Sequence, residues 1–153
     1  MSEHKAHVRW TLASGEFTKG RYSRAHSWRF DGGLTVPASP SPAVVPAPWC
    51  DESAVDPEEA FVASIASCHM LTFLWLASRE GLEVTSYEDE AVGTMTKNER
   101  RVPWVSRVVL SPKIAWREEP SAEVLARLHH QAHEQCFIAN SVKTEIVVQA
   151  REV

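Results

Sequence analysis

The chain has 153 residues, a formal net charge of −4 and a hydrophobic fraction of 44%. This length and composition fit a single domain with a real core over residues 1–153, and the absence of a basic run removes electrostatic support for nucleic-acid binding. The first residues lack an apolar signal-peptide core, so we expect a cytoplasmic protein whose three cysteines are not a disulfide scaffold.

Alternating apolar and polar residues predict two strands near the N-terminus. Residues His7–Ala13 and Arg21–Phe30 both alternate, and Ser14 with Gly15 marks a turn between them. We therefore expect an antiparallel hairpin, followed by a short strand at residues 34–36.

Residues 37–57 contain six of the nine prolines and predict an extended loop. Cys50 lies in this loop beside Trp49. Asp51 and Glu52 follow it directly and disfavour a thiolate, so we expect a structural or incidental thiol at this position.

Residues 56–81 predict a long central helix around which the rest of the chain is organised. Asp56 can cap its start, Glu59 completes a capping box, and Gly81 suits its end. Between Ala60 and Ser78 there is no formal charge, so we expect the helix to be buried on all sides.

The uncharged part of this helix is nearly long enough to cross a bilayer. Acidic residues lie at its start and polar residues interrupt it, which favours a core helix and no membrane association. The interrupting residues are Ser64, Ser67, His69, Thr72 and Ser78.

Two long stretches after the helix are rich in strand-forming residues, at 82–98 and 102–117, with a turn at 98–101 between them. Pro103 and Pro112 indicate edges or bends in the second stretch.

Helical spacing predicts a second helix at Ser121–Gln135, and Val142–Ala150 alternates as a last strand. The resulting order of strands, helix, strands, helix and strand indicates an α+β fold with antiparallel sheets.

Two cysteines lie on these helices, Cys68 in the middle of the first and Cys136 at the end of the second. A cysteine thiolate can attack a peroxide and become a sulfenic acid, which a second thiol converts to a disulfide. That cycle needs a second thiol within reach and a cation beside the first. Spacing alone also permits an inert core thiol at Cys68.

The segment DPEEAFVASIASCHMLTFLWLASREGLEV resembles the central helix of the OsmC/Ohr peroxidases, which reduce organic hydroperoxides. That family carries an Asn-Pro-Glu-Glu/Gln signature followed by apolar residues and Ala-Cys. The segment HEQCFIANSVKTEI resembles its second-cysteine region. The resemblance implies the OsmC-like fold, an intertwined homodimer whose antiparallel sheets wrap around central helices, with no cofactor.

The resemblance also implies roles for individual residues. Cys68 falls at the peroxidatic position, Cys136 at the resolving position and Glu58 at a conserved glutamate. An N-terminal arginine is expected to bind both the glutamate and the thiolate, with Arg24 as our choice and Arg21 as the rival. The implied partners are an organic hydroperoxide and a dithiol reductant, such as a lipoylated protein.

Glu58 and Cys68 are ten residues apart, which on one helix corresponds to about 15 Å of rise and about 280° of rotation. They cannot meet directly within one helix. Either Glu58 arrives from a partner subunit, or it orients an arginine that spans part of the gap.

The chain departs from the family pattern at Phe137, which follows Cys136 where the better-characterised peroxidases have proline. This departure leaves the substrate in doubt.

Three alternatives to a peroxidase stay open. His129, His133 and Cys136 lie at i, i+4 and i+7, a spacing that could hold a soft metal, although ordinary surface histidines are the simpler interpretation. The same fold could also bind a small apolar ligand or act as a thiol redox sensor.

Overall fold

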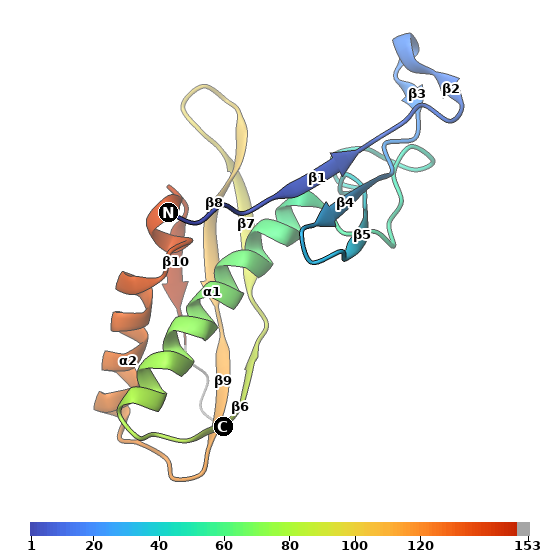
Figure 1. The fold of residues 1–153 in the computed structure, drawn as a ribbon. Helices are drawn as coiled ribbons and strands as arrows, with labels where there is room; N and C mark the ends of the chain where they lie inside the picture. The colour runs from blue at the N-terminus through green and yellow to red at the C-terminus, as the bar shows by residue number, and fades with distance from the viewer. Residues whose placement is uncertain (150–153) are drawn as a thin grey trace. The chain divides into compact units, whose positions relative to one another are not determined.

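The computed structural model describes residues 1–149, and the chain divides into two compact units, Met1–Ala60 and Phe61–Val153. Figure 1 labels the elements in chain order. The first unit contains β1 (Ala6–Arg9), β2 (Gly15–Glu16), η1 (Phe17–Lys19), β3 (Arg21–Tyr22), β4 (His26–Phe30) and β5 (Thr35–Ala38). The helix α1 (Pro57–Arg79) begins there and continues through the second unit.

The N-terminal strands pair as a sheet in the order β1-β4-β5, antiparallel throughout. The predicted pairing is confirmed, since Ala6 faces Phe30, but the strands are shorter than expected and a small β2–β3 hairpin lies between them. Gly15 makes this hairpin possible, because its φ is 104° and a Cβ would lie 2.2 Å from the Arg21 carbonyl oxygen.

The predicted capping box at the start of α1 is present. The Glu59 N–H donates to Asp56 Oδ1 at 2.7 Å, and the Asp56 N–H donates to Glu59 Oε2 at 3.0 Å. At the other end Gly81 has a φ of 74°, and the Leu82 N–H donates to the Ala77 carbonyl at 3.0 Å. This bond closes the helix in the manner of a Schellman motif.

The expectation that α1 is buried on all sides is wrong for the single chain. Its buried residues are Ile65, His69, Phe73 and Ala77, which repeat every four positions and so form one stripe. On other faces of the helix Leu71 is 60% exposed and Trp75 50% exposed. Sheet strands and the second helix cover one side of α1 and leave an apolar surface on the others.

By length and composition alone, α1 is also the helix among the described residues that could cross a membrane. The core helix of a globular protein meets the same criteria, so this observation does not distinguish the two.

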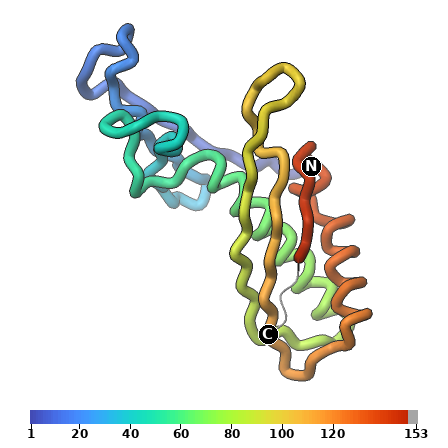
Figure 2. Tube along the Cα trace, turned by 180° about the vertical axis from the view of Figure 1, so that it is seen from behind, coloured from blue at the N-terminus to red at the C-terminus, as the bar shows by residue number. Residues whose placement is uncertain are grey.

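The second unit contains β6 (Val84–Asp89), β7 (Val92–Lys97), β8 (Pro103–Leu110), β9 (Pro112–Trp116), α2 (Ala122–Gln135), η2 (Ala139–Ser141) and β10 (Glu145–Val148). Each long extended stretch predicted from the sequence is thus two strands. They pair as antiparallel β7–β8 and β6–β9, and Figure 2 shows the two long stretches of chain running side by side. Both stretches break at the same level, where the Ser111 N–H donates to Asp89 Oδ1 at 2.7 Å.

The expected last strand is present as β10, and it pairs with β8 in parallel. The predicted end of that strand, Ala150, lies outside the described residues. The α+β fold with antiparallel sheets is confirmed, with this one parallel pair added among the described strands.

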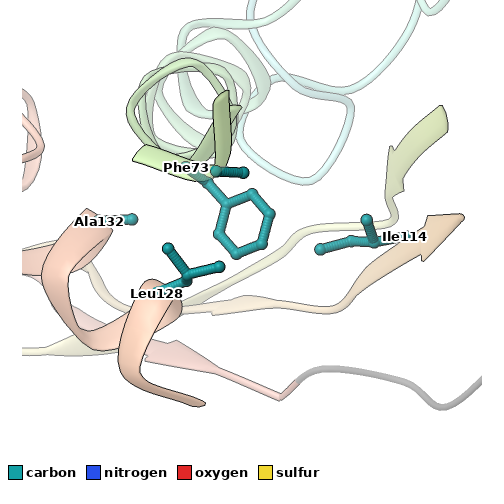
Figure 3. Packing of buried hydrophobic residues seen from close by; sticks show 5 residues of the cluster. Phe73, Ile114, Leu128 and Ala132 are labelled. Atoms are coloured by element: carbon teal, nitrogen blue, oxygen red, sulfur yellow. The ribbon is translucent and has the colours of Figure 1, made fainter. Parts of the chain in front are cut away.

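Helix α2 begins where predicted, because the Ser121 side chain accepts a hydrogen bond from the Val124 N–H. Figure 3 shows how it packs: the ring of Phe73 from α1 lies between Leu128 of α2 and Ile114 of β9, with Ala132 beside it. This core holds α1 and α2 side by side on the strands and thereby fixes the positions of the two cysteines.

Candidate thiol site

Cys68 and Cys136 lie together although 67 residues separate them in sequence. Cys68 is half-buried in the middle of α1. Cys136 is the C-cap of α2, with an extended backbone (φ −68°, ψ 118°), and its side chain is 1% exposed. The backbone N–H groups of the consecutive residues Ile138 and Ala139 donate to the sulfurs of Cys68 and Cys136 respectively, so the two thiols are neighbours, as disulfide formation requires.

The two sulfurs have different environments. Burial, and then the neighbouring Cys68 thiol, raise the pKa of Cys136 to about 11, while the backbone N–H groups of Ala139 and Ile138 act in the opposite direction. Cys136 therefore keeps its proton at neutral pH.

Backbone donors also reach both sulfurs. The Ile138 N–H donates to Cys68 Sγ at 3.5 Å, and the Ala139 N–H donates to Cys136 Sγ at 3.4 Å. The Ile138 N–H is thus in place to stabilise negative charge that develops on the Cys68 sulfur. Sequence reasoning missed these groups because a backbone N–H carries no residue signature; the segment was predicted only as a loop.

Cys68 lines a cavity of about 920 Å³ in the second unit. Most of its wall is apolar, formed by one side of α1 and by the turn after α2. The lining residues are Ser64, Ser67, Cys68, Leu71, Thr72, Trp75, Gln135 and Phe137. A small apolar molecule could therefore approach the half-buried Cys68.

The other predicted site residues belong to the first unit. Arg24 is half-buried in the loop after β3, where its guanidinium donates to the carbonyl of Tyr22 at 2.8 Å and stacks over the Tyr22 ring at 4.1 Å. Arg21 is exposed and forms an ion pair with Glu16 at 3.5 Å. Glu58 is half-buried in the first turn of α1.

The proposed metal site at His129, His133 and Cys136 is not present. Helix α2 ends at Gln135, with Cys136 as its C-cap, and the Cys136 thiol lies beside Cys68. No group of three or more metal-ligating side chains exists among residues 1–149.

The expectation of surface histidines on α2 is wrong for His129, which is 6% exposed. His129 Nδ1 and His69 Nε2 share a hydrogen bond of 3.1 Å between the two helices. Burial, followed by the neighbouring His129 and His133, lowers the pKa of His69 to about 4, and burial lowers the pKa of His129 to about 4. Both imidazoles are neutral at pH 7. His130 is exposed and lies 3.4 Å from Glu134.

Cys50 is half-buried in the proline-rich loop of the first unit and is a free thiol. The Asp51 N–H beside it donates to Ser39 Oγ at 2.8 Å. Nothing in its surroundings assigns it to the thiol pair.

The fold is mixed α/β, and two helices bring a pair of thiols together. Comparison with known proteins shows the family to which this protein belongs. The profile described as OsmC-like protein matches residues 50–151, so the chain belongs to the OsmC-like family. No curated protein matches it.

Several solved structures share its fold. An OsmC-like protein of unknown function from Vibrio cholerae is 50% identical, with a TM-score of 0.95 over 99% of this chain and 100% of that one. Two structures of organic hydroperoxide resistance proteins are more distant in sequence. The OhrB protein of Bacillus subtilis is 18% identical (TM-score 0.67, 98% of each chain). The protein of Elizabethkingia anophelis is 16% identical (TM-score 0.73, 98% of this chain and 94% of that one).

Proposed function

We propose that the protein is a thiol-dependent peroxidase that reduces organic hydroperoxides in the cytoplasm. The observation that carries the proposal is the adjoining pair of Cys68 and Cys136 beside an apolar cavity. The hydroperoxide resistance proteins that share the fold point to the same chemistry.

In this mechanism the Cys68 thiolate attacks one oxygen of the hydroperoxide. An S–O bond forms, the O–O bond breaks, and the alkoxide leaves as an alcohol after taking a proton. The Cys136 sulfur then attacks the sulfenic acid, which forms the disulfide and releases water. An external dithiol reduces the disulfide by exchange and is itself oxidised.

A cation beside Cys68 completes the proposal, and we assign this role to Arg24. Within its own unit Arg24 binds backbone carbonyls and an aromatic ring, none of which carries a formal charge, whereas the Arg21 charge is paired with Glu16. Glu58 would orient the guanidinium. Since Glu58 and Cys68 are separated along one helix, the simplest arrangement brings Glu58 from the partner in a homodimer.

The test is steady-state consumption of an alkyl hydroperoxide with dihydrolipoamide as reductant. We expect turnover by the wild type and its loss to background in Cys68→Ser, because no other thiol lines the cavity among the described residues. Burying about two methylenes in the cavity is worth about 1.6 kcal/mol, so an alkyl hydroperoxide should be preferred to hydrogen peroxide by about tenfold.

Matched variants serve as controls. Cys50→Ser should turn over normally. Arg24→Ala should lose about 100-fold in rate, as expected for removing one charged donor from a reacting anion, and Arg21→Ala should not. A protein that is oxidised once and then stops would be a sensor, and undiminished turnover in Cys68→Ser would refute the peroxidase assignment.

A further inference from the structure

The segment Cys136–Ser141, called here the cysteine turn, is braced by its own side chains and backbone. Asn140 Nδ2 donates to the carbonyls of Glu134 at 2.8 Å and Cys136 at 2.9 Å. The Asn140 N–H also donates to the Cys136 carbonyl, at 3.0 Å. Ser141 Oγ donates to the Phe137 carbonyl at 2.7 Å.

These bonds satisfy carbonyls that the end of a helix leaves without partners. Helix α2 stops at Gln135, and the Asn140 side chain reaches back to two carbonyls on either side of that stop. A single side chain therefore ties the turn to the helix end and sets the direction in which the turn leaves it.

The backbone N–H groups that reach the sulfurs lie between Cys136 and Asn140, the two residues that these hydrogen bonds join. Ile138 donates to Cys68 Sγ and Ala139 to Cys136 Sγ, both through backbone N–H groups, which only a substitution to proline would remove. Their aim depends on the path of the turn, since a hydrogen bond weakens steeply with angle.

We propose that Asn140 is a positioning residue: by bracing the cysteine turn it aims the Ile138 N–H at Cys68 and stabilises the anionic form of that sulfur. The proposal rests on the proposed role of Cys68 as the reacting thiol. Its test, however, measures the thiol itself and requires neither peroxide nor turnover.

The experiment measures the rate at which iodoacetamide alkylates Cys68 in the reduced protein, with peptide mass distinguishing the three cysteines. For Asn140→Ala we expect a rate about tenfold lower than wild type at neutral pH, corresponding to a misaimed hydrogen bond to a charged group. The rates should converge at strongly alkaline pH, where Cys68 is fully ionised in both proteins.

A merely structural role would produce a different pattern. A loosened turn changes access to the sulfur, and access alters the rate by the same factor at every pH. Equal rates for Asn140→Ala and wild type at neutral pH, or a difference that persists unchanged at alkaline pH, would overturn the proposal.

Two further variants guard against a fold defect. Asn140→Gln keeps the amide donors and should recover part of the neutral-pH rate. Ser141→Ala removes the second side-chain brace and should slow alkylation by a smaller factor than Asn140→Ala. Glu134→Ala is the matched control, because its backbone carbonyl and hence the Asn140 bond remain, and its rate should equal that of wild type.

The outcome is separable from that of the peroxidase proposal. Absence of turnover together with the pH-dependent Asn140 effect would refute the peroxidase and leave the positioning role. Normal turnover without the Asn140 effect would do the reverse.

Discussion

His69 and His129 form a hydrogen-bonded imidazole pair buried between α1 and α2. The inner nitrogens share one proton in this bond. The outer nitrogens, His69 Nδ1 and His129 Nε2, have no hydrogen-bond partner among the described residues. The pair is tolerated because both rings are neutral, and a charge on either ring would be buried without compensation.

This pair predicts how stability depends on pH. Both histidines have a pKa of about 4 in the folded protein against 6.5 in the unfolded chain, so below pH 6.5 the unfolded chain binds more protons. The free energy of unfolding therefore has its full value above about pH 6.5 and decreases as the pH falls toward 4. The slope is at most about 2.7 kcal/mol per pH unit for two protons. Urea unfolding at a series of pH values measures it.

The control is the double variant His69→Leu with His129→Leu, which fills the site with apolar side chains. Its free energy of unfolding should fall less steeply over the same pH range than that of wild type. Parallel curves for the two proteins would contradict the prediction, because they would show that the pair binds protons equally in the folded and the unfolded state.

At the scale of the element, α1 presents an apolar surface that the described chain leaves exposed. Leu71 and Trp75 are at least half exposed on a helix that carries no charge from Ala60 to Ser78. An exposed apolar patch of this kind marks an interaction surface. We propose that a second copy of the chain covers it, which fits the notion that Glu58 is supplied by the partner.

The prediction for this element is a change in oligomeric state. Leu71→Glu together with Trp75→Glu should convert a dimer into a monomer in sedimentation equilibrium, because burying two unpaired carboxylates opposes association. Val102→Glu, at a residue 51% exposed in the β7–β8 turn, is the control and should stay dimeric. A wild-type monomer at micromolar concentration would contradict the proposal.

Local signals predicted the elements well where the interactions are local. The capping box of Asp56 and Glu59, the end at Gly81 and the cap at Ser121 depend on residues within one or two turns, and all are present. Pro112 indicated a bend in the second stretch, and that stretch does break at residue 111. The break at residues 90–91 was not predicted, since the Ser111–Asp89 bond beside it is set by pairing across the hairpin.

At the scale of the whole molecule, the site depends on contacts between distant segments. The resemblance suggested that Cys68 and Cys136 meet, and packing of Phe73 against Leu128 and Ile114 brings their helices together. The same packing buries His129 against His69, which composition and spacing could not reveal. The backbone donors of the cysteine turn were also beyond sequence reasoning, because they depend on where α2 ends.

The central claim is that Cys68 reacts with a peroxide and that Cys136 then forms a disulfide with it. The most direct measurement is the intact mass of the reduced protein after one equivalent of an alkyl hydroperoxide, followed by peptide mapping. We predict a loss of two hydrogen atoms with Cys68 and Cys136 in one linked peptide, and a gain of one oxygen atom on Cys68 in Cys136→Ser. An unchanged mass, or a disulfide that instead involves Cys50, would contradict the account.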